Sequence, residues 1–435
     1  MQQQQSTALV WFRNDLRTQD NSVLQSALST SKPVIGVYFL EPQWFEKHEF
    51  GFKKMEKFRT KFLLETLKCL QNELKKLNIS LLVFEDSAEN KMKSIVKSYN
   101  VSDVFLQKEW TAEESMSLQN VKKGLPTEIK IHQYHDQFLF HPDDLPFHFC
   151  DTPKVFTQFR KQLEKKSKVR ELIKNKPQSD AFLLKKTSTI PTLNALGYED
   201  IKVDNRSAFP FSGGEISAFE RLHHYFFESK ALGVYKKTRN GLLGLNYSSK
   251  FSPWLANGSL SARQIYWSIK AFENQFFSNQ STYWLIFELI WRDFFKYVSL
   301  KHGNEIFKID GILKNEYEWS NHKKYILQWI NGETTNDFVN ANMIELKTTG
   351  WMSNRGRQNV ASFFAKTQKL DWRIGAAYFE SMLLDYDVHS NYGNWMYVAG
   401  VGNDPRDRIF NVKLQAERYD ANQKYRQQWL QSKLF

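Results

Sequence analysis

Short apolar runs alternate with longer amphipathic segments over the first 134 residues. Five of the runs are rich in β-branched and aromatic residues, and the segments between them repeat their apolar positions every three or four residues. Strands that alternate with helices predict a parallel sheet with helices on both faces. The expected strands are residues 8–12, 34–40, 80–84, 104–106 and 129–134, and the clearest expected helices are residues 55–77 and 89–99.

The loop after the first expected strand has no glycine motif. Residues 13–17 read Arg-Asn-Asp-Leu-Arg where a dinucleotide-binding sheet has GxGxxG, and the chain contains no GxxxxGK[ST] phosphate loop. We therefore expect residues 1–134 to form a doubly wound parallel α/β domain that does not bind a dinucleotide in the usual crevice.

The pattern changes after residue 134. Residues 135–210 show no clear periodicity and include the lysine-rich stretch 161–186, so this region is expected to be a connector with some helix. Residues 211–435 are expected to form an all-α domain, because apolar residues recur there at helical spacing. The expected helices are residues 217–229, 261–277, 282–301, 325–330, 336–346 and 357–368.

The chain is basic, with 435 residues, a formal net charge of +13 and a pI of about 9.3. This charge suits a polyanionic partner, and a lysine-rich solubilising surface is the plain alternative. Aromatic residues make up 15% of the chain and include 13 Trp, which favours the first interpretation because aromatic faces beside cations suit unstacked bases. A mean hydropathy of −0.55 and the lack of an apolar run of about 18 residues argue against a membrane protein.

Cysteine and histidine usage predicts neither disulfides nor a metal site. Cys69 and Cys150 lie far apart and form no CxxC motif, so we expect a reducing compartment. His132 and His135 form an HxxH pair without further ligands at metal-binding spacing. The first residues resemble neither a secretory signal nor a transit peptide, so a cytoplasmic protein is expected, with the nucleoid or nucleus left open.

One polar cluster lies within an expected long helix. Glu288, Trp291 and Arg292 stand at positions i, i+3 and i+4, so they share one helix face. Such a face can build a site. The plain alternative is an amphipathic helix with a Glu288–Arg292 ion pair on its surface.

Further clusters follow along the helical half. Asn354 and Gln358 share a face, while Arg357 points elsewhere and could hold a carboxylate with its guanidinium fork; solvated arginines at a helix start are the alternative. Asp385 and Asp387 could be acid–base groups, metal ligands or acceptors for a heterocycle N–H and sugar hydroxyls. The hydroxyl-rich stretch 246–254 before an expected helix suits a phosphate cradle, or only a helix cap.

These clusters, in this order and spacing, resemble the FAD-binding half of photolyases and cryptochromes. Residues 11–17 extend the resemblance over essentially the whole chain. It implies a U-shaped FAD held inside the helical domain. The stretches most similar to the cryptochrome-DASH branch of this superfamily are residues 238–253, 280–293, 350–363, 385–395 and 402–406.

The resemblance assigns cofactor contacts to matching positions. Arg357 would pair with Asp385 against the flavin ring. Asp387 would lie beside the flavin and its sugar chain, and Asn391 would face flavin N5. The phosphates would be held by Tyr235, Ser248, Ser249, Lys250, Phe251 and Ser252, and Arg292 and Asn354 would also contact the cofactor.

The resemblance also implies an electron relay of three tryptophans. Trp395 would lie nearest the flavin, followed by Trp372 and then by Trp319 near the surface. Without the resemblance, these three residues would be interpreted as ordinary core rings.

Repair of cyclobutane pyrimidine dimers by an electron from excited, reduced FAD is the activity that the resemblance implies. Glu288 would contact the dimer, Trp291 would form an aromatic wall against it, and Asn354 would lie between flavin and lesion. Arg239 and Arg355 would contact backbone phosphates. A lesion leaves the base stack at least cost in an unpaired strand.

Two positions depart from the ordinary dimer photolyase. Gln358 stands in place of a Met and Tyr397 in place of a second wall Trp, which is the DASH pattern. The pocket is therefore expected to be narrower and more polar, with single-stranded DNA as substrate and RNA or duplex DNA bound more weakly. Ser353 and Asn354 occupy positions where (6-4) photolyases carry histidines, so that chemistry is not expected.

The resemblance further implies a 5,10-methenyltetrahydrofolate antenna between the domains. Glu113 best matches its carboxylate contact, with Glu114 one residue away. Two other functions stay open, a blue-light photoreceptor and a nucleic-acid-binding regulator with little repair activity. The chain ends soon after the flavin motifs, without the long tail of signalling cryptochromes, which favours the enzyme. A monomer is expected.

Overall fold

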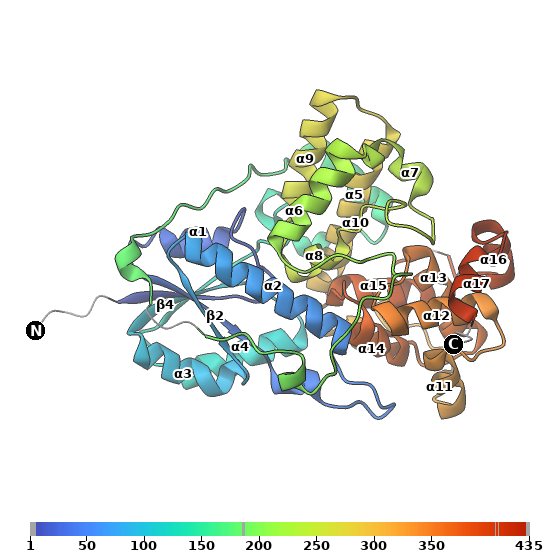
Figure 1. Ribbon diagram of the computed structural model, residues 1–435, viewed down its shortest axis with the longest axis horizontal. Coiled ribbons are helices and arrows are strands. Elements are labelled where there is room, and N and C mark those ends of the chain that lie inside the picture. The colour runs from blue at the N-terminus through green and yellow to red at the C-terminus, as the bar shows by residue number, and fades with distance from the viewer. Residues whose placement is uncertain (1–5, 185–187, 405, 408, 432–435) are drawn as a thin grey trace, which may run out of the picture.

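Five parallel strands form the N-terminal sheet of the computed structural model, which describes residues 6–184, 188–404, 406–407 and 409–431. The strand order is β3-β2-β1-β4-β5, so the chain starts in the middle of the sheet and winds outwards in both directions (Figure 1). All five expected strands are confirmed. They are β1 Thr7–Trp11, β2 Val34–Phe39, β3 Ser80–Phe84, β4 Val101–Gln107 and β5 Lys130–Tyr134.

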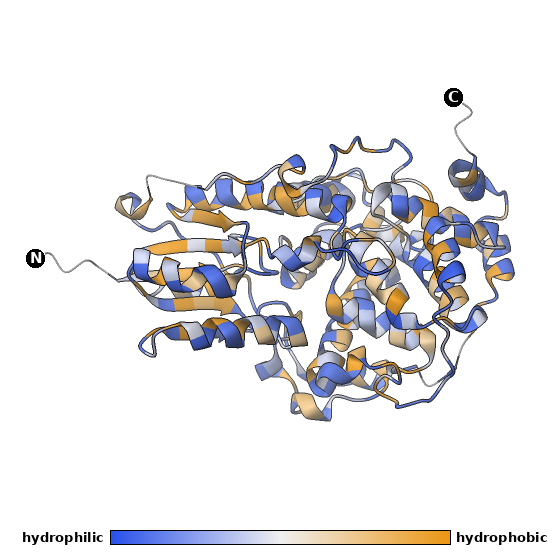
Figure 2. Cartoon of the chain, turned by 90° about the horizontal axis from the view of Figure 1, so that it is seen from below, coloured by the Kyte–Doolittle hydropathy of each residue, from blue (hydrophilic) through white to orange (hydrophobic). Residues whose placement is uncertain are grey.

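Two helices cover each face of the sheet. Successive residues of β1 point to opposite faces, so Val10 packs with α1 (Ser22–Leu28) and α2 (Lys57–Lys76), whereas Leu9 packs with α3 (Ala88–Ser98) and α4 (Ala112–Gly124). Both faces are therefore apolar, as the hydropathy colouring of the strands shows (Figure 2). The expected α/β domain with a doubly wound parallel sheet is confirmed.

Helices make up most of the chain after residue 211, as expected. Two of them, α6 and α13, continue into a π-helical turn, so the long periodic segments 217–229 and 357–368 each stay continuous. The helices are α6 Glu215–His223, α7 Tyr235–Thr238, α8 Ser252–Asn257, α9 Ala262–Gln275, α10 Gln280–His302, α11 Lys323–Asn331, α12 Asp337–Thr349, α13 Asn354–Ser362, α14 Trp372–Met382, α15 Val388–Ala399, α16 Val412–Tyr419 and α17 Lys424–Leu430.

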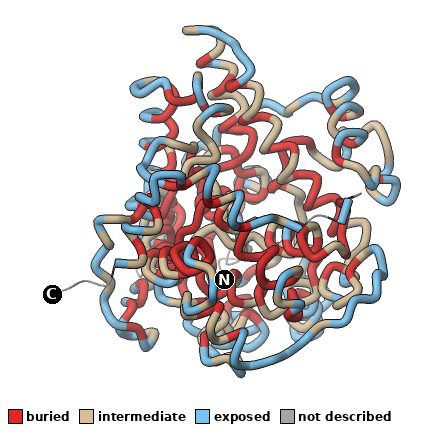
Figure 3. The backbone as a smooth tube through the Cα atoms, turned by 90° about the vertical axis from the view of Figure 1, so that its right-hand side faces the viewer, coloured by how far each residue is buried: buried red, intermediate tan, exposed pale blue. Residues whose placement is uncertain are grey.

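Side-chain caps set several helix starts that matter for the site. Ser353 accepts a hydrogen bond from the Gly356 amide at the start of α13, and Asp387 accepts one from the Ser390 amide at the start of α15. Buried segments run through the interior of the helical part, and exposed ones gather at its loops (Figure 3). Within the part of the chain that the structure describes, none of the helices combines the length and apolar character needed to cross a bilayer.

The segment between the two parts contributes to the helical core. Its helix α5 (Phe156–Lys166) packs on α10, where the Phe156 ring stacks on Trp291 with centroids 3.7 Å apart. Phe138 and Phe140 join the same apolar cluster. The divisions at residues 134 and 210 stay predictions, and Pro405 of the stretch 402–406 lies outside the described residues.

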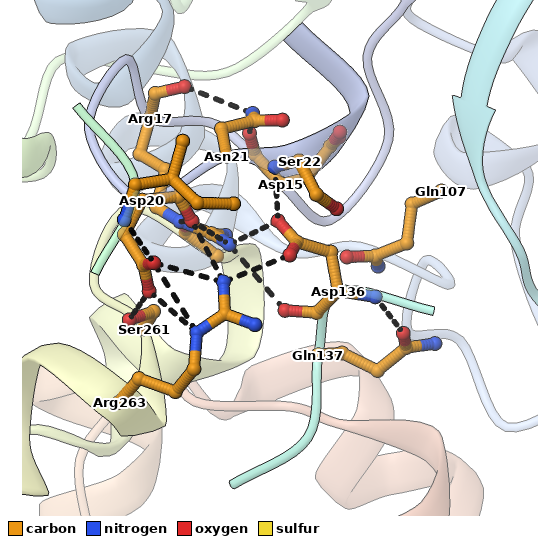
Figure 4. Close-up of polar contacts among 12 residues, drawn as sticks. Asp15, Arg17, Asp20, Asn21, Ser22, Gln107, Asp136, Gln137, Ser261 and Arg263 are labelled. Carbon is orange, nitrogen blue, oxygen red and sulfur yellow. Dashed lines mark hydrogen bonds and ion pairs between the residues drawn. The ribbon is translucent and has the colours of Figure 1, made fainter. Parts of the chain in front are cut away.

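A buried network of four charges joins the sheet to the helices (Figure 4). Arg263 of α9 places Nη2 2.9 Å from Asp20 Oδ1 and 3.0 Å from Asp136 Oδ1. Arg17 pairs with the other oxygen of Asp136, and its Nη1 donates to the Gly258 carbonyl oxygen at 3.0 Å. The loops that follow β1 and β5 are thereby tied to α8 and α9.

Gly258 is required at this junction for two reasons. Its φ of +75° lies in the left-handed region, and a Cβ atom there would come within 2.0 Å of the Asn14 carbonyl oxygen. Only a residue without a side chain allows the two parts of the chain to approach this closely.

Removal of one cation from the network should destabilise the protein. Arg263→Ala is expected to lower the free energy of unfolding by about 3–5 kcal/mol, because Asp20 and Asp136 would stay buried with too little compensating charge. Urea denaturation followed by tryptophan fluorescence measures the change. The control Lys308→Ala removes an exposed ion pair with Glu305 and should leave the midpoint unchanged. Equal midpoints for Arg263→Ala and the parent would show that the network adds no stability.

Candidate functional site

A cavity of about 470 Å³ opens within the helical part. Its walls come from α7, α8, α10, α13, α15 and the loops that precede α8 and α15. Side chains predicted from five separate stretches of sequence meet here. They are Tyr235, Arg239, Ser248, Ser249, Lys250, Phe251, Ser252, Glu288, Trp291, Arg292, Asn354, Arg357, Gln358, Asp385, Asp387, Asn391, Trp395 and Tyr397.

Arg357 and Asp385 form an ion pair in the cavity wall. Arg357 Nη2 lies 3.0 Å from Asp385 Oδ1, and Arg357 Nε donates to the Met352 carbonyl oxygen at 2.9 Å. Asp385 Oδ1 is buried and receives no hydrogen bond of good geometry within the described residues. A buried carboxylate oxygen with this spare capacity fits a ligand N–H such as that of a flavin ring.

Asp387 is held ionised by its surroundings. It pairs with Lys296 Nζ at 2.7 Å, and both side chains are nearly buried. Burial by itself would raise the pKa of Asp387, but the charges of Lys296 and Arg292 hold this pKa far below its usual range. The cavity wall therefore carries an ionised carboxylate next to the Lys296 amino group, whose own pKa burial lowers.

The amide of Asn391 has a defined orientation. Its Nδ2 donates to the Ala376 carbonyl oxygen at 3.0 Å, so the nitrogen is already used. The Oδ1 atom is then left as the acceptor for a ligand in the cavity. An acceptor at this point matches the contact expected for a protonated flavin N5.

Arg221 organises the hydroxyl-rich loop, a role that was not predicted from the sequence. This buried residue of α6 donates to the carbonyl oxygens of Leu245, Ser248 and Ser249 and to Asn246 Oδ1, at 2.8–3.1 Å. With these carbonyl groups turned towards Arg221, the hydroxyl groups of Ser248 and Ser249 stay available to the cavity. Only the tertiary contact identifies this residue, because α6 is far from the loop in sequence.

Lys250 is buried in an aromatic environment. Its Nζ lies 3.2 Å from the centroid of the Tyr247 ring and 4.6 Å from that of Trp351, without a hydrogen-bond acceptor among the described residues. Burial lowers the pKa of Lys250 well below its usual value. The Nζ atom faces these rings and not an acceptor, so the expected contact of Lys250 with a phosphate stays a prediction.

The cavity lining also includes a carboxylate beside aromatic rings. Glu288 pairs with Arg239, and burial raises its pKa although Arg239 opposes the shift. The alternative pair with Arg292 does not form, because Arg292 donates to the carbonyl oxygens of Gln137 and Leu255. The Trp291 ring meets Tyr397 edge-on at 6.3 Å, so the two rings form a corner.

Arg355 lies outside the cavity, near its rim. Its Nη1 donates to Gln358 Oε1 at 2.9 Å, its Nη2 donates to Asn240 Oδ1 at 3.0 Å, and the guanidinium lies over the Tyr419 ring. This position agrees with the expected contact between Arg355 and the backbone of a DNA strand that enters the cavity. That contact stays a prediction.

The three tryptophans of the expected relay differ in how deeply they are buried. Trp395 and Trp372 are buried, and Trp319 is partly buried; no ring contact joins any two of these three described residues. The Trp395 ring packs on Gly375, one turn after Trp372 on α14, where a Cβ atom would come within 2.3 Å of it. The relay therefore stays a prediction, and it would run through α14.

Trp329 is a neighbour of this relay that the sequence did not indicate. It is fully buried, and its ring meets that of Trp395 at 6.2 Å. Nothing in the local sequence distinguishes it from a core residue.

A second cavity of about 390 Å³ lies between the sheet and the helices. Glu113 and Glu114 line it, but Glu113 is 60% exposed at its side chain and pairs with Lys54. Glu109, which was not predicted from the sequence, is a partly buried carboxyl group here. Burial raises its pKa to about 7, and Gln107 Nε2 donates to it at 2.7 Å. Its place directly after β4 is the signal that could have found it.

Histidines and acids form no metal cluster in the described part of the chain. His132 of the HxxH pair lies 2.9 Å from Asp103 Oδ1, one strand away, which is a partner that sequence spacing did not reveal.

Comparisons with known proteins support the family resemblance that the sequence motifs indicated. The DNA photolyase family model matches residues 8–179, and the model of the FAD-binding domain of DNA photolyase matches residues 284–433. The chain is 44% identical to a cryptochrome DASH of Danio rerio over 98% of this chain and 83% of that protein, and 43% identical to one of Synechocystis sp. over 98% and 87%. A crystal structure of a Synechocystis cryptochrome superimposes with a TM-score of 0.93 at 42% identity, covering 99% of this chain and 89% of that chain.

Glu345, a buried carboxyl group close enough to Lys250 to interact with it electrostatically, provides a test of the site's electrostatics. Tyr425 Oη lies 2.6 Å from Glu345 Oε2 and 3.0 Å from Asn342 Oδ1, yet a phenol has one proton. Both contacts are satisfied when Glu345 is protonated and donates to Tyr425. Burial raises the pKa of Glu345 to about 7 from an ordinary 4.5.

Between pH 4.5 and 7 the folded state thus binds a proton that the unfolded state lacks, so stability falls as the pH rises through this window. Glu345→Gln should raise the melting temperature at pH 8 by roughly 2–4 °C and change it little at pH 5. Thermal melts across this range measure the effect, with Glu316→Gln on the exposed surface as control. A constant difference at every pH would contradict a protonated Glu345.

Proposed function

The chain belongs to the cryptochrome DASH group of the DNA photolyase family, and from this premise we propose that it repairs cyclobutane pyrimidine dimers in single-stranded DNA under light. The observation that carries the proposal is a single cavity lined by two different sets of side chains. One set offers Arg357, Asp385 and Asn391 for a flavin, and the other offers Glu288 and Trp291 for a substrate.

FAD fits beside Arg357 and Asp385, because Asp385 Oδ1 and Asn391 Oδ1 have acceptor capacity to spare for the N–H groups of a reduced flavin. Bound in its reduced state and excited by light, it would supply an electron to the dimer and take it back after ring opening. Arg357 and Asp385 would orient the ring, and Lys296 would hold the Asp387 carboxylate in place.

Glu288 and Trp291 would bind the extruded lesion. The Glu288 carboxylate, paired with Arg239, would accept a hydrogen bond from a pyrimidine N–H, while Trp291 covers one side of the pocket. Gln358 and Tyr397 make the pocket here more polar, so less apolar contact is available to offset the cost of unpairing the lesion. An unpaired strand avoids that cost.

Repair of matched substrates tests the function. Under blue light with a reductant, the purified protein should restore dimer-bearing oligothymidine and act at least about ten-fold more slowly on the same lesion in a duplex. Glu288→Ala should lower the single-strand rate by roughly 10- to 100-fold through the lost charge-assisted contact, with the exposed Glu316→Ala as control. A flavin that is photoreduced while no dimer is repaired would favour a blue-light photoreceptor instead.

The proposed relay has its own test. Trp395→Phe should slow photoreduction of the oxidised flavin, because it removes the redox-active ring next to the cavity. It should leave repair by chemically reduced enzyme intact. Trp329→Phe is a matched control, since this ring also contacts Trp395 but lies off the expected path. Equal photoreduction rates in the parent and Trp395→Phe would refute the relay.

We also propose 5,10-methenyltetrahydrofolate as the ligand of the second cavity. Glu109 supports this, because a partly buried carboxyl group in the cavity lining can accept N–H groups of a pterin. Folate released from the denatured protein and measured by absorbance checks the proposal. Glu109→Gln should reduce the bound folate more than Glu113→Gln, whose side chain is mostly exposed. Equal retention in both variants would argue against a folate held by Glu109.

A further inference from the structure

The outer face of α10 is aromatic where a surface helix is expected to be polar. Its inner face is buried in the core through Leu285, Ile286, Leu289 and Ile290. The rings of the outer face are only partly buried and follow one another at helical spacing: Tyr283, Trp284, Phe287 and Trp291. Phe287 and Trp291 line the site cavity, whereas Trp284, one turn earlier on the helix, is not among the lining residues.

Trp284 continues the wall of the cavity outwards. Its ring stacks on that of Phe287 with centroids 4.6 Å apart and planes inclined by 24°. The ammonium group of Lys236 lies 4.3 Å from its centroid, and the guanidinium of Arg239 lies at 5.5 Å. An indole with one face on a ring and cations nearby is a suitable platform for a base.

The charges around this platform are unbalanced in favour of cations. Glu288 is paired with Arg239, and Glu164 at the far end of the strip is paired with Arg160. Lys236 donates only to Gln280 Oε1, and no ion pair of the described residues joins Lys236 or Lys237 to a carboxylate. The strip therefore presents unneutralised positive charge beside half-exposed rings, which suits a phosphate backbone with unpaired bases.

We propose that Trp284 and Lys236 form a second binding position for single-stranded DNA, outside the cavity that takes the dimer. This rests on the proposed function. Trp284 and Trp291 are seven residues apart, about 10 Å along the helix axis, so a strand with its lesion against Trp291 passes over Trp284. A base flanking the dimer stacks on the indole, and Lys236 moves from the ring to the adjacent phosphate. Since every base has a π face, this position binds without regard to sequence.

Binding of oligothymidines of different length tests the inference. The parent should bind a dimer flanked by several nucleotides more tightly than an isolated dimer dinucleotide. In Trp284→Ala the ratio of these two affinities should fall by about 5- to 100-fold, the range for loss of one stacked base. Trp284→Phe should keep most of the ratio because it retains a ring. Fluorescence anisotropy measures the flanked substrate, and competition measures the dinucleotide.

Trp267→Ala is the matched control, a partly buried tryptophan on α9 whose indole N–H donates to the Arg170 carbonyl oxygen, away from the cavity. It should bind all substrates as the parent does. Lys236→Gln adds an independent measurement, since loss of one phosphate contact should reduce the slope of log affinity against log salt by about 0.7.

The outcomes separate this inference from the proposed function. Undamaged oligothymidine should also bind more weakly to Trp284→Ala than to Trp267→Ala, whether or not any dimer is repaired. An unchanged ratio in Trp284→Ala, or an equal loss for flanked and isolated dimers, would overturn the stacking position. A parent that binds oligothymidine through Trp284 but repairs nothing would remove the proposed function and leave the binding position intact.

Discussion

Four buried charges hold the two parts of this molecule together. Arg17, Asp20, Asp136 and Arg263 come from two sheet loops and one helix, and each meets at least one partner of opposite charge. Ions buried in this way are tolerated only when all of them are paired, so the network permits one docking geometry and penalises others. Gly258 lies at the same junction, just after α8, whose preceding loop lines the site cavity. The shape of both cavities depends on that docking.

The cavity itself is built from charges that are balanced before a ligand arrives. Asp385 pairs with Arg357, and Asp387 pairs with Lys296, so each carboxylate in the wall beside the expected flavin has a basic side chain next to it. Such preorganisation matters for electron transfer, because a fixed environment needs little rearrangement when charge moves. Burial raises the pKa of Glu345 as well, and there it favours the neutral form.

Several features of the site could not be predicted from the sequence. Glu288 has Arg292 one turn away, yet its partner is Arg239, because the packing of α7 against α10 decides which cation is nearer. Arg221 was missed since its role consists of contacts to a loop more than 20 residues later. Glu109 was passed over in favour of Glu113, because exposure of a carboxyl group depends on what packs over it.

Local pattern alone determined the strands, most of the helices and the resemblance of five stretches to a flavin-binding family. Periodicity depends on residues that are close together in the chain, and motif spacing depends on the order of residues along it. Both can therefore be read from the sequence. The tertiary structure decided which charges pair, which carboxyl groups are buried and which rings touch. Those properties depend on desolvation and on distances between segments far apart in sequence, and no linear pattern encodes them.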